Sequence, residues 1–389
     1  MSKFVFPREI FYGENALEQL KSLKGKKRAV IVTGGTAMQK HGFLERSEKL
    51  LNEVGIETKL IEGVEHDPSI QTVMKGAKTM QEFDPDVIVA IGGGSPIDAA
   101  KAMWVFYEHP ELTFDDIKDP FTIPKLRNKA IFVAIPSTSG TASEVTAFSV
   151  ITDYTTNIKY PLADFEITPD IAILDYALPR TMPKQLIAHT GMDAITHAIE
   201  AYVSKAANQV TDALAIYAIS SIFENIECFY NGSVDSGAKV HVAQCMAGMA
   251  FTHALLGIVH SMAHKTGAEF NIPHGCCNAL LLPYAIQFNA HKAPEKYAEI
   301  ARSLGLCGRT EKQLINSLVK EIKALNKRLG IKQTFKDNGV SEEHFLKKVE
   351  EISKNAAADP CTSSNPREAT AKDLKQILTC AFYGEDVII

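Results

Sequence analysis

The first 180 residues alternate between two kinds of segment, and this alternation constrains the fold more than any other feature of the chain. Short runs of β-branched and other apolar residues, typical of strands, occur at 28–35, 57–62, 86–94 and 130–138. Between them lie amphipathic stretches such as 72–83, in which apolar residues recur at helical spacing. Strands that alternate with helices predict βαβ units around a Rossmann-like parallel sheet. Three further short β runs at 141–182 are expected to finish that sheet.

The character of the chain changes near residue 180. From there on it is rich in Ala, Leu, Glu, Lys and Met, and segments such as 212–230 and 311–330 have helical periodicity without a convincing strand. The sequence therefore predicts an α/β dinucleotide-binding domain over residues 1–180 and an all-helical, metal-binding domain over 181–389. Residues 246–259 form an apolar run that is too short to span a bilayer, which needs about 20 residues, and we predict a buried helix there.

Composition excludes several classes of function. The formal charge is -5, so no basic surface for nucleic acid or for a membrane is expected. The first residues lack the apolar core of a signal peptide. The 7 cysteines are odd in number and irregularly spaced, without a Cys-x-x-Cys pair, which argues against a disulfide scaffold or a thiolate zinc site. A cytoplasmic location is predicted.

A glycine-rich turn follows the strand predicted at 86–94. In GGGSPIDAAK, we expect Gly93 and Gly94 to allow close approach of a ligand, Ser95 to cap a helix and Asp98 to lie in its first turn. Free N–H groups and the positive end of the helix dipole then favour an anion such as phosphate. The segment matches neither the G-x-G-x-x-G nor the Walker pattern, so a well-capped βα turn without a ligand remains the alternative.

A second polar loop follows the strand predicted at 130–138. Its sequence PSTSGTASEVT places Ser137, Thr138 and Thr141 around a glycine, where hydroxyls can donate to phosphate or ribose oxygens. The alternative is a turn that merely caps the next segment. Open α/β sheets bind ligands where neighbouring strands end, so the two loops together favour a nucleotide-type cofactor.

The end of the first long strand indicates which dinucleotide is used. Enzymes selective for NAD usually place a carboxylate there, which binds the adenosine ribose and repels the extra phosphate of NADP. This chain has Gly34 and Gly35 instead, so NADP has room. Lys40 could pair with that phosphate, although a solvated helix lysine is the simpler interpretation.

Histidines and an aspartate in the second half have the spacing of metal ligands. Asp193 and His197 lie four residues apart, as do His260 and His264, and His274 follows ten residues later. A helix can direct an i, i+4 pair at one ion, and imidazole with carboxylate suits Fe(II), Zn(II) or Co(II). Each histidine alone is better explained as a hydrogen-bonded core residue; the cluster favours a metal.

Four motifs occur in an order that resembles a known family. GGGSPIDAAK, PSTSGTASEVT, HTGMDAITHAIEAY and GIVHSMAHKTG with IPHG are similar to the iron-containing (group III) alcohol dehydrogenases, of the butanol dehydrogenase type, over nearly the whole chain. The resemblance implies a dehydroquinate synthase-like fold, a small primary alcohol or aldehyde as substrate, and a homodimer. It implies metal ligation by Asp193, His197, His260 and His274, with Fe(II) favoured and Zn(II) as the alternative, and proton relay by His264.

The resemblance also implies a set of cofactor contacts. These contacts are Asp67, Gly93, Gly94, Ser95, Asp98, Thr138, Thr141, Lys159 and Leu178. Ser137 and Gly34 are further predicted contacts, inferred from the polar loop and from the first strand. The sequence departs from the family pattern in three places. Gly34 replaces an Asp common in NAD-selective relatives, which favours NADP(H) over NAD(H); Asp67 stands where several relatives have Asn; and Thr252 with His253 stands where many have Ser and Asn.

The expected reaction is hydride transfer between the nicotinamide and the alcohol or aldehyde, in a cleft between the two domains. Three alternatives remain open from the sequence. A dehydroquinate-synthase-like lyase would need a basic cluster, and only Lys265 lies near the histidines; a metal hydrolase would give no reason for two phosphate-type loops; a nucleotide sensor without catalysis would not need a competent ligand set.

Overall fold

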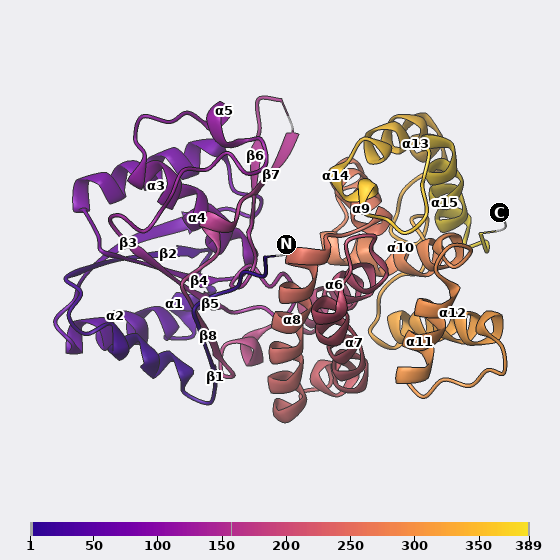
Figure 1. The fold of residues 1–389 in the computed structure, drawn as a ribbon, viewed down its shortest axis with the longest axis horizontal. Coiled ribbons are helices and arrows are strands. Elements are labelled where there is room, and N and C mark those ends of the chain that lie inside the picture. Colours follow the sequence, from indigo (N-terminus) through magenta and orange to yellow (C-terminus); the bar gives the residue numbers. More distant parts are fainter. Residues whose placement is uncertain (1–2, 157, 388–389) are drawn as a thin grey trace. The chain divides into compact units, whose positions relative to one another are not determined.

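The computed structural model describes residues 3–156 and 158–387. The chain divides into two compact units, Met1–Met182 and Pro183–Ile389, here called unit 1 and unit 2. Unit 1 is built on a parallel sheet with helices on both faces, and the described part of unit 2 is helical (Figure 1). The predicted fold class, an α/β unit followed by an all-helical one, is confirmed.

All six strands of the main sheet run parallel. They are β1 (Glu9–Gly13), β2 (Arg28–Gly34), β3 (Glu57–Val64), β4 (Val87–Gly92), β5 (Ile131–Pro136) and β8 (Ile171–Asp175), in the spatial order β1, β8, β5, β4, β2, β3. Every residue of β4 is buried, as the unbroken apolar run predicts for a strand covered on both faces.

Helices cover the two faces of the sheet with different residue sets. Alternate residues of β2 and β4, such as Val30 and Ile88, pack against α3 (Ile70–Phe83) and α4 (Gly94–Glu108). Their neighbours, such as Ile31, pack against η1 (Ala16–Leu23) and α2 (Phe43–Glu53). Because successive side chains of a strand point to opposite faces, each strand contributes to both cores. The short helical turns of unit 1 are α1 (Ala37–Lys40), α5 (Phe114–Ile117), η2 (Phe165–Ile167) and η3 (Pro179–Thr181).

Two details of the sheet differ from the sequence prediction. Of the three short β runs at 141–182, only β8 joins the main sheet, whereas β6 (Phe148–Asp153) and β7 (Ile158–Ala163) form a separate antiparallel pair. The edge strand β1 has no counterpart in the prediction. Its five residues are too few to show a periodicity, and its place is set by parallel pairing with β8, which is distant in sequence.

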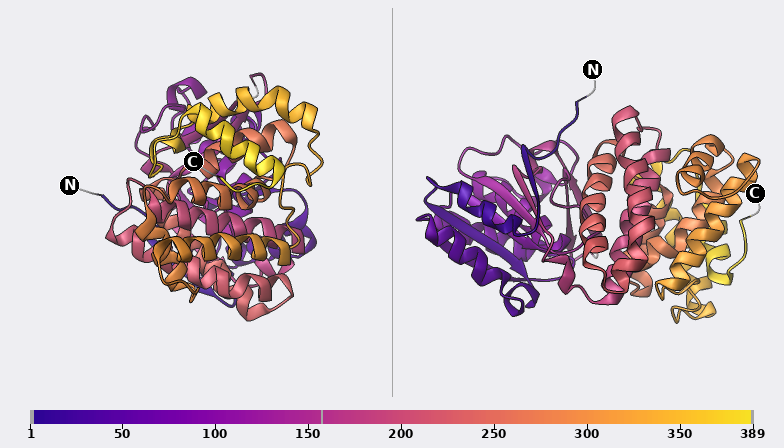
Figure 2. Two further views of the ribbon diagram at one scale, coloured as in Figure 1. Left: turned by 90° about the vertical axis from the view of Figure 1, so that its right-hand side faces the viewer. Right: turned by 90° about the horizontal axis from the view of Figure 1, so that it is seen from below.

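Unit 2 packs its helices on one another (Figures 1 and 2). They are α6 (Lys184–Val203), α7 (Gln209–Tyr230), α8 (Val234–Ala254), α9 (Ile258–Phe270), α10 (His274–Asn289), α11 (Pro294–Ser303), α12 (Glu311–Arg328), α13 (Glu342–Ala357), α14 (Pro360–Ser363) and α15 (Ala371–Tyr383). Within the described ranges, no single helix has the length and hydropathy of a membrane span; the pair α8 and α9 reaches both only when its two helices are taken together.

The predicted single helix at 246–259 is wrong. The helix α8 ends at Ala254, Leu255 has a positive φ of 63°, and α9 begins at Ile258 at an angle of 105° to α8. Gly257, just before α9, lies close to another helix: a Cβ atom there would be 2.8 Å from Glu200 Oε1. The bend therefore brings the start of α9 against α6, which matters for the metal ligands below.

Candidate active site

The carboxyl ends of β2 and β4 mark the point where the sheet reverses its strand order. From β2 the chain adds β3 on one side, and then returns to add β4 on the other. Open parallel sheets bind ligands at such a switch point, beyond the carboxyl ends of the strands. Gly34 ends β2, and the glycine turn at 92–95 follows β4.

The two predicted cofactor loops lie directly against each other. The strands β4 and β5 that lead into them are neighbours, and Ser137 N donates a hydrogen bond to Gly92 O at 2.7 Å. A Cβ atom on Gly93 would be 3.4 Å from Thr138, and one on Gly94 would be 3.1 Å from Thr141. A side chain at Gly94 would thus crowd the second loop, and one at Gly93 would be in ordinary van der Waals contact with it. The two glycines keep the backbone of the first loop close to the threonines of the second, an arrangement in which a phosphate could bind.

The start of the helix after the first loop differs from the prediction. The helix α4 begins at Gly94, one residue before the predicted cap, and Gly93 occupies the cap position without a side-chain hydrogen bond. Ser95 therefore lies inside the first turn and does not cap it. Asp98 Oδ2 accepts a hydrogen bond from Val150 N at 3.0 Å, and burial raises the pKa of its carboxyl. This bond ties the helix to β6.

Asp67 and Lys159, which are far apart in sequence, form an ion pair. Lys159 Nζ lies 2.7 Å from Asp67 Oδ2. The hydrogen bond with His66 and the charge of Lys159 together hold the pKa of Asp67 well below its usual range. Two residues that the family resemblance assigns to the cofactor are thus neighbours in unit 1.

The remaining predicted cofactor residues of unit 1 have different surroundings. Gly34 is tightly packed, because a Cβ atom there would lie 2.7 Å from Val64 O and 3.6 Å from Pro96 Cδ. Lys40 is exposed at the end of α1. Leu178 follows β8 and is fully buried in the core, so its side chain is a packing residue and only its backbone could reach a ligand.

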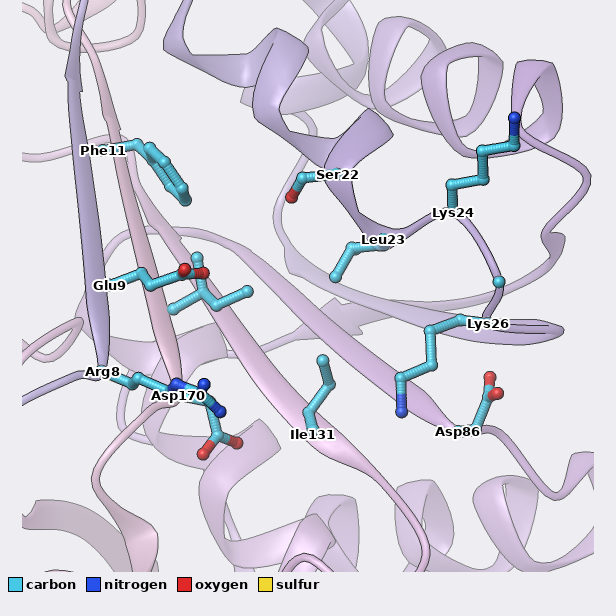
Figure 3. Close-up of a pocket in the computed structure, with 12 residues that line it drawn as sticks. Arg8, Glu9, Phe11, Ser22, Leu23, Lys24, Lys26, Asp86, Ile131 and Asp170 are labelled. Atoms are coloured by element: carbon cyan, nitrogen blue, oxygen red, sulfur yellow. The ribbon is translucent and has the colours of Figure 1, made fainter.

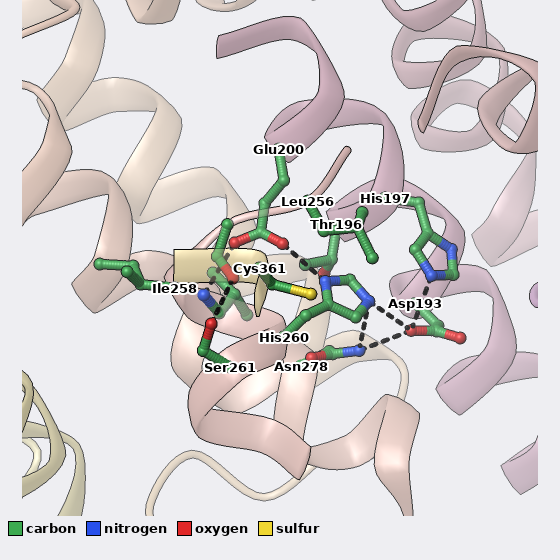
Figure 4. Close-up of polar contacts among 12 residues, drawn as sticks. Asp193, Thr196, His197, Glu200, Leu256, Ile258, His260, Ser261, Asn278 and Cys361 are labelled. Atoms are coloured by element: carbon green, nitrogen blue, oxygen red, sulfur yellow. Dashed lines mark hydrogen bonds and ion pairs between the residues drawn. The ribbon is translucent and has the colours of Figure 1, made fainter. Parts of the chain in front are cut away.

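Three imidazoles converge on one carboxylate oxygen in unit 2, and two of them, His197 and His260, are seen beside Asp193 in Figure 4. Asp193 Oδ1 lies 3.9 Å from His197 Nε2, 3.6 Å from His260 Nε2 and 3.6 Å from His274 Nε2. The donors come from three helices: Asp193 and His197 from adjacent turns of α6, His260 from α9, and His274 from the first residue of α10. Of the four predicted ligands, Asp193, His260 and His274 form one compact group, whereas His197 Nε2 lies near Asp193 Oδ1 but outside that group.

These separations fit a single divalent cation. Four donors bonded tetrahedrally at about 2.1 Å would be about 3.4 Å apart, close to the separations between Asp193 Oδ1 and the histidine nitrogens. Potential ligand atoms of Asp193, His260 and His274 all lie within 4.8 Å of one another. Burial opposes ionisation of Asp193, but its interactions with the imidazoles of His197, His274 and His260 outweigh this effect and keep its pKa well below the usual range. The carboxylate is therefore charged, as a ligand must be.

Glu200 orients one of the ligands and was not predicted. Its Oε2 atom lies 2.6 Å from His260 Nδ1, and its Oε1 accepts a hydrogen bond from Val259 N at 2.7 Å. Metal-bound histidines commonly donate their second ring N–H to a carboxylate, which leaves the other nitrogen free to ligate. The signal in the sequence was a glutamate seven residues after Asp193 in an apolar helix, on the same face of α6.

His264 lies beside this cluster and has its own partner. Its ring stacks on that of His274, with centroids 5.5 Å apart, and its Nδ1 lies 3.2 Å from Asp359 Oδ2. Lys265 Nζ also approaches Asp359 Oδ2, at 3.0 Å. Burial disfavours the charged Asp359 carboxylate, but His264 and Lys265 outweigh this effect and hold its pKa well below the usual range. The side chains of His264 and His274 are 31% and 41% exposed, whereas Asp193, His197 and His260 are buried, so this is the accessible side of the cluster.

The residues Thr252 and His253, which depart from the family pattern, lie in the last turn of α8. Thr252 is buried and His253 is partly buried. Their neighbour Phe251 stacks on His197, with ring centroids 4.4 Å apart. This part of α8 therefore packs against the proposed ligand His197 through Phe251.

A hollow of about 620 Å³ lies elsewhere in unit 1 (Figure 3). Its lining includes Glu9, Ile131 and Ile171, each at the first residue of its strand. It therefore lies at the amino ends of the strands, the opposite edge from the two loops. Parallel sheets bind ligands at the carboxyl ends, and we assign this hollow no role in the active site.

Comparisons with known proteins identify the family to which the chain is similar. A family model described as iron-containing alcohol dehydrogenase matches residues 7–176, and one described as the C-terminal part of the Fe-containing alcohol dehydrogenase family matches residues 187–382. An NADPH-dependent butanol dehydrogenase of Clostridium saccharobutylicum is 59% identical over 387 residues, which cover 100% of both chains.

Two further similar proteins are a longer enzyme, which the chain matches only in part, and a protein of solved structure. An aldehyde-alcohol dehydrogenase of Streptococcus pneumoniae is 43% identical over 97% of this chain, but the match covers only 46% of that protein. The solved structure of an iron-containing alcohol dehydrogenase from Thermococcus thioreducens is similar with a TM-score of 0.90 and 40% identity, over 98% of this chain and 100% of that one.

Proposed function

Because the chain belongs to the iron-containing alcohol dehydrogenase family, we propose that it interconverts small primary alcohols and aldehydes with NADP(H), using a cation held by Asp193, His197, His260 and His274. The observation that carries the proposal is the convergence of three imidazole nitrogens on one charged carboxylate oxygen, at 3.6 to 3.9 Å. Fe(II) is the favoured cation, with Zn(II) as the alternative for the same donors.

Residues near the proposed cation would orient its ligands and transfer a proton. A bound divalent cation supplies Lewis acidity, which lowers the pKa of an alcohol and polarises an aldehyde carbonyl. Glu200 holds His260 in the orientation that directs Nε2 at the centre. Asp359 engages His264 Nδ1, so His264 Nε2 is the atom that can take up and release a proton. His264 is the proposed catalytic residue, and Asp359 is a positioning residue.

For the cofactor, we propose the two loops of unit 1 as the binding surface. The nicotinamide supplies the hydride chemistry, while Gly93, Gly94, Thr138 and Thr141 would hold its phosphates and ribose. The lack of a carboxylate at Gly34 favours NADPH, in agreement with the NADPH-dependent relative. The ion pair of Asp67 and Lys159 is the further contact that the family resemblance assigns.

For the substrate, the butanol dehydrogenase at 59% identity favours a short unbranched alcohol such as butanol, and butyraldehyde in reverse. A homodimer remains a prediction from the family resemblance, and a cytoplasmic location remains a prediction from the cysteine pattern and the first residues of the sequence. A lyase of the same fold would need a basic pocket, whereas Lys265, the lysine next to His264 in the sequence, is paired with Asp359.

The proposal predicts metal-dependent consumption of NADPH. Protein loaded anaerobically with Fe(II) should oxidise NADPH in the presence of butyraldehyde, and removal of the metal with a chelator should abolish turnover, because the carbonyl is no longer polarised. Absorbance of NADPH measures the rate, and circular dichroism verifies that the stripped protein stays folded. Activity should return on adding Fe(II) or Zn(II). Unchanged turnover in folded protein shown to contain no metal would contradict the proposal.

A further inference from the structure

A neutral amide reaches into the centre of the proposed ligand set. Asn278 Nδ2 lies 2.6 Å from Asp193 Oδ1 and 3.1 Å from His260 Nε2 (Figure 4), and 3.0 Å from His274 Nε2. Asn278 is one turn after His274 on α10 and is completely buried. One side-chain nitrogen therefore lies within hydrogen-bonding distance of three of the four proposed metal ligands.

The orientation of this amide follows from its neighbours. If the oxygen replaced the nitrogen, it would lie 2.6 Å from a charged carboxylate oxygen, which is strongly repulsive. With the nitrogen there, Asn278 can donate to Asp193 and to an imidazole. Among the described residues, no donor reaches Asn278 Oδ1, so the contacts that fix this side chain are those to the ligand atoms.

These hydrogen bonds use the same lone pairs that a cation needs. The Nδ1 atom of His260 is engaged by Glu200 at 2.6 Å, so Nε2 is the ring nitrogen left to bind a cation, and its lone pair is the one that faces Asn278 Nδ2. That lone pair can accept a hydrogen bond from Asn278 or bind a cation, but not both. The same holds for His274 whenever its Nε2 is the acceptor.

We propose that Asn278 competes with the cation: its amide satisfies the ligand atoms when they bind no metal, and it must turn away when metal binds. The inference rests on the proposed metal centre and adds a residue that sets its affinity. A buried carboxylate and buried imidazole nitrogens without partners are costly. By supplying hydrogen bonds to them, Asn278 stabilises the metal-free protein and thereby weakens metal binding.

Two variants test the competition. Asn278→Ala removes the donor, and Asn278→Asp keeps the size of the side chain while replacing the donor with a negative charge that repels Asp193 and attracts a cation. Both should lower the melting temperature of the metal-free protein more than that of the Zn(II)-loaded protein. Both should also tighten Zn(II) binding, measured by competition with a chromophoric chelator, by about tenfold or more, since a hydrogen bond to a charged group is lost only in the metal-free form.

Asn326→Ala is the matched control. Asn326 is also buried in unit 2, but its Nδ2 donates to a backbone oxygen, Ala279 O at 2.7 Å, and not to a proposed metal ligand. This variant should destabilise both forms equally and leave the Zn(II) affinity unchanged. Unchanged or weaker Zn(II) binding in both Asn278 variants would overturn the inference. Failure of the metal centre itself is a separate result: Asp193→Ala would then bind Zn(II) as tightly as the unaltered protein.

Discussion

Replacing His260 with alanine is expected to abolish metal retention and to reduce turnover by about a thousandfold or more, because Lewis-acid stabilisation is worth several kcal/mol. The variant loses a ligand and also leaves Glu200 without the imidazole that it orients. Binding of NADPH should change little, since the proposed cofactor loops belong to unit 1. Metal content after dialysis, steady-state rates and NADPH fluorescence titration measure the three effects.

A matched control for His260→Ala is His241→Ala. His241 is also a fully buried histidine of unit 2, on α8, and burial lowers its pKa to about 3, so it is a neutral core residue. This control should lower stability without loss of metal per folded chain. Full turnover by folded His260→Ala protein that contains no metal would refute the ligand assignment.

Replacing Gly34 with aspartate is expected to shift the cofactor preference from NADPH towards NADH by about tenfold or more, because a carboxylate beside the adenosine ribose repels the extra phosphate. The measured quantity is the ratio of kcat/KM for the two cofactors. Crowding complicates this variant, since any Cβ atom at this position lies 2.7 Å from Val64 O.

Gly34→Asn separates the charge from the crowding. Asparagine has nearly the same size as aspartate and would displace Val64 equally, but it carries no charge. We expect Gly34→Asn to lower kcat/KM for both cofactors with a much smaller change in their ratio. If the aspartate and asparagine variants have the same preference ratio, Gly34 does not face the adenosine ribose.

The strands and helices that carry the site were largely predictable because their signals are local. The apolar runs of β2, β4 and β5 and the glycine turn after β4 need no partner to be recognised. The edge strand β1 has no such signal, because pairing with β8 determines it. The break between α8 and α9 was hidden by continuous apolar residues, and only the positive φ of Leu255 and the close approach at Gly257 reveal it.

The ligand spacing on each helix was readable, whereas the contacts between helices were not. An i, i+4 pair identifies the face of α6 and of α9, but nothing in the sequence states that the two faces meet. Glu200, on α6, contacts the ligand His260 on α9. Asn278, on α10, contacts Asp193 on α6 and His260 on α9. Their roles therefore depend on the packing of α6, α9 and α10, which periodicity alone does not determine.

The most direct test of the account is the metal content of single-ligand variants. After anaerobic loading with Fe(II) and extensive dialysis, the unaltered protein should hold one tightly bound metal per chain. Folded Asp193→Ala, His197→Ala, His260→Ala and His274→Ala proteins should each hold much less. One metal per chain in the unaltered protein and in all four variants would show that these side chains do not form the metal centre.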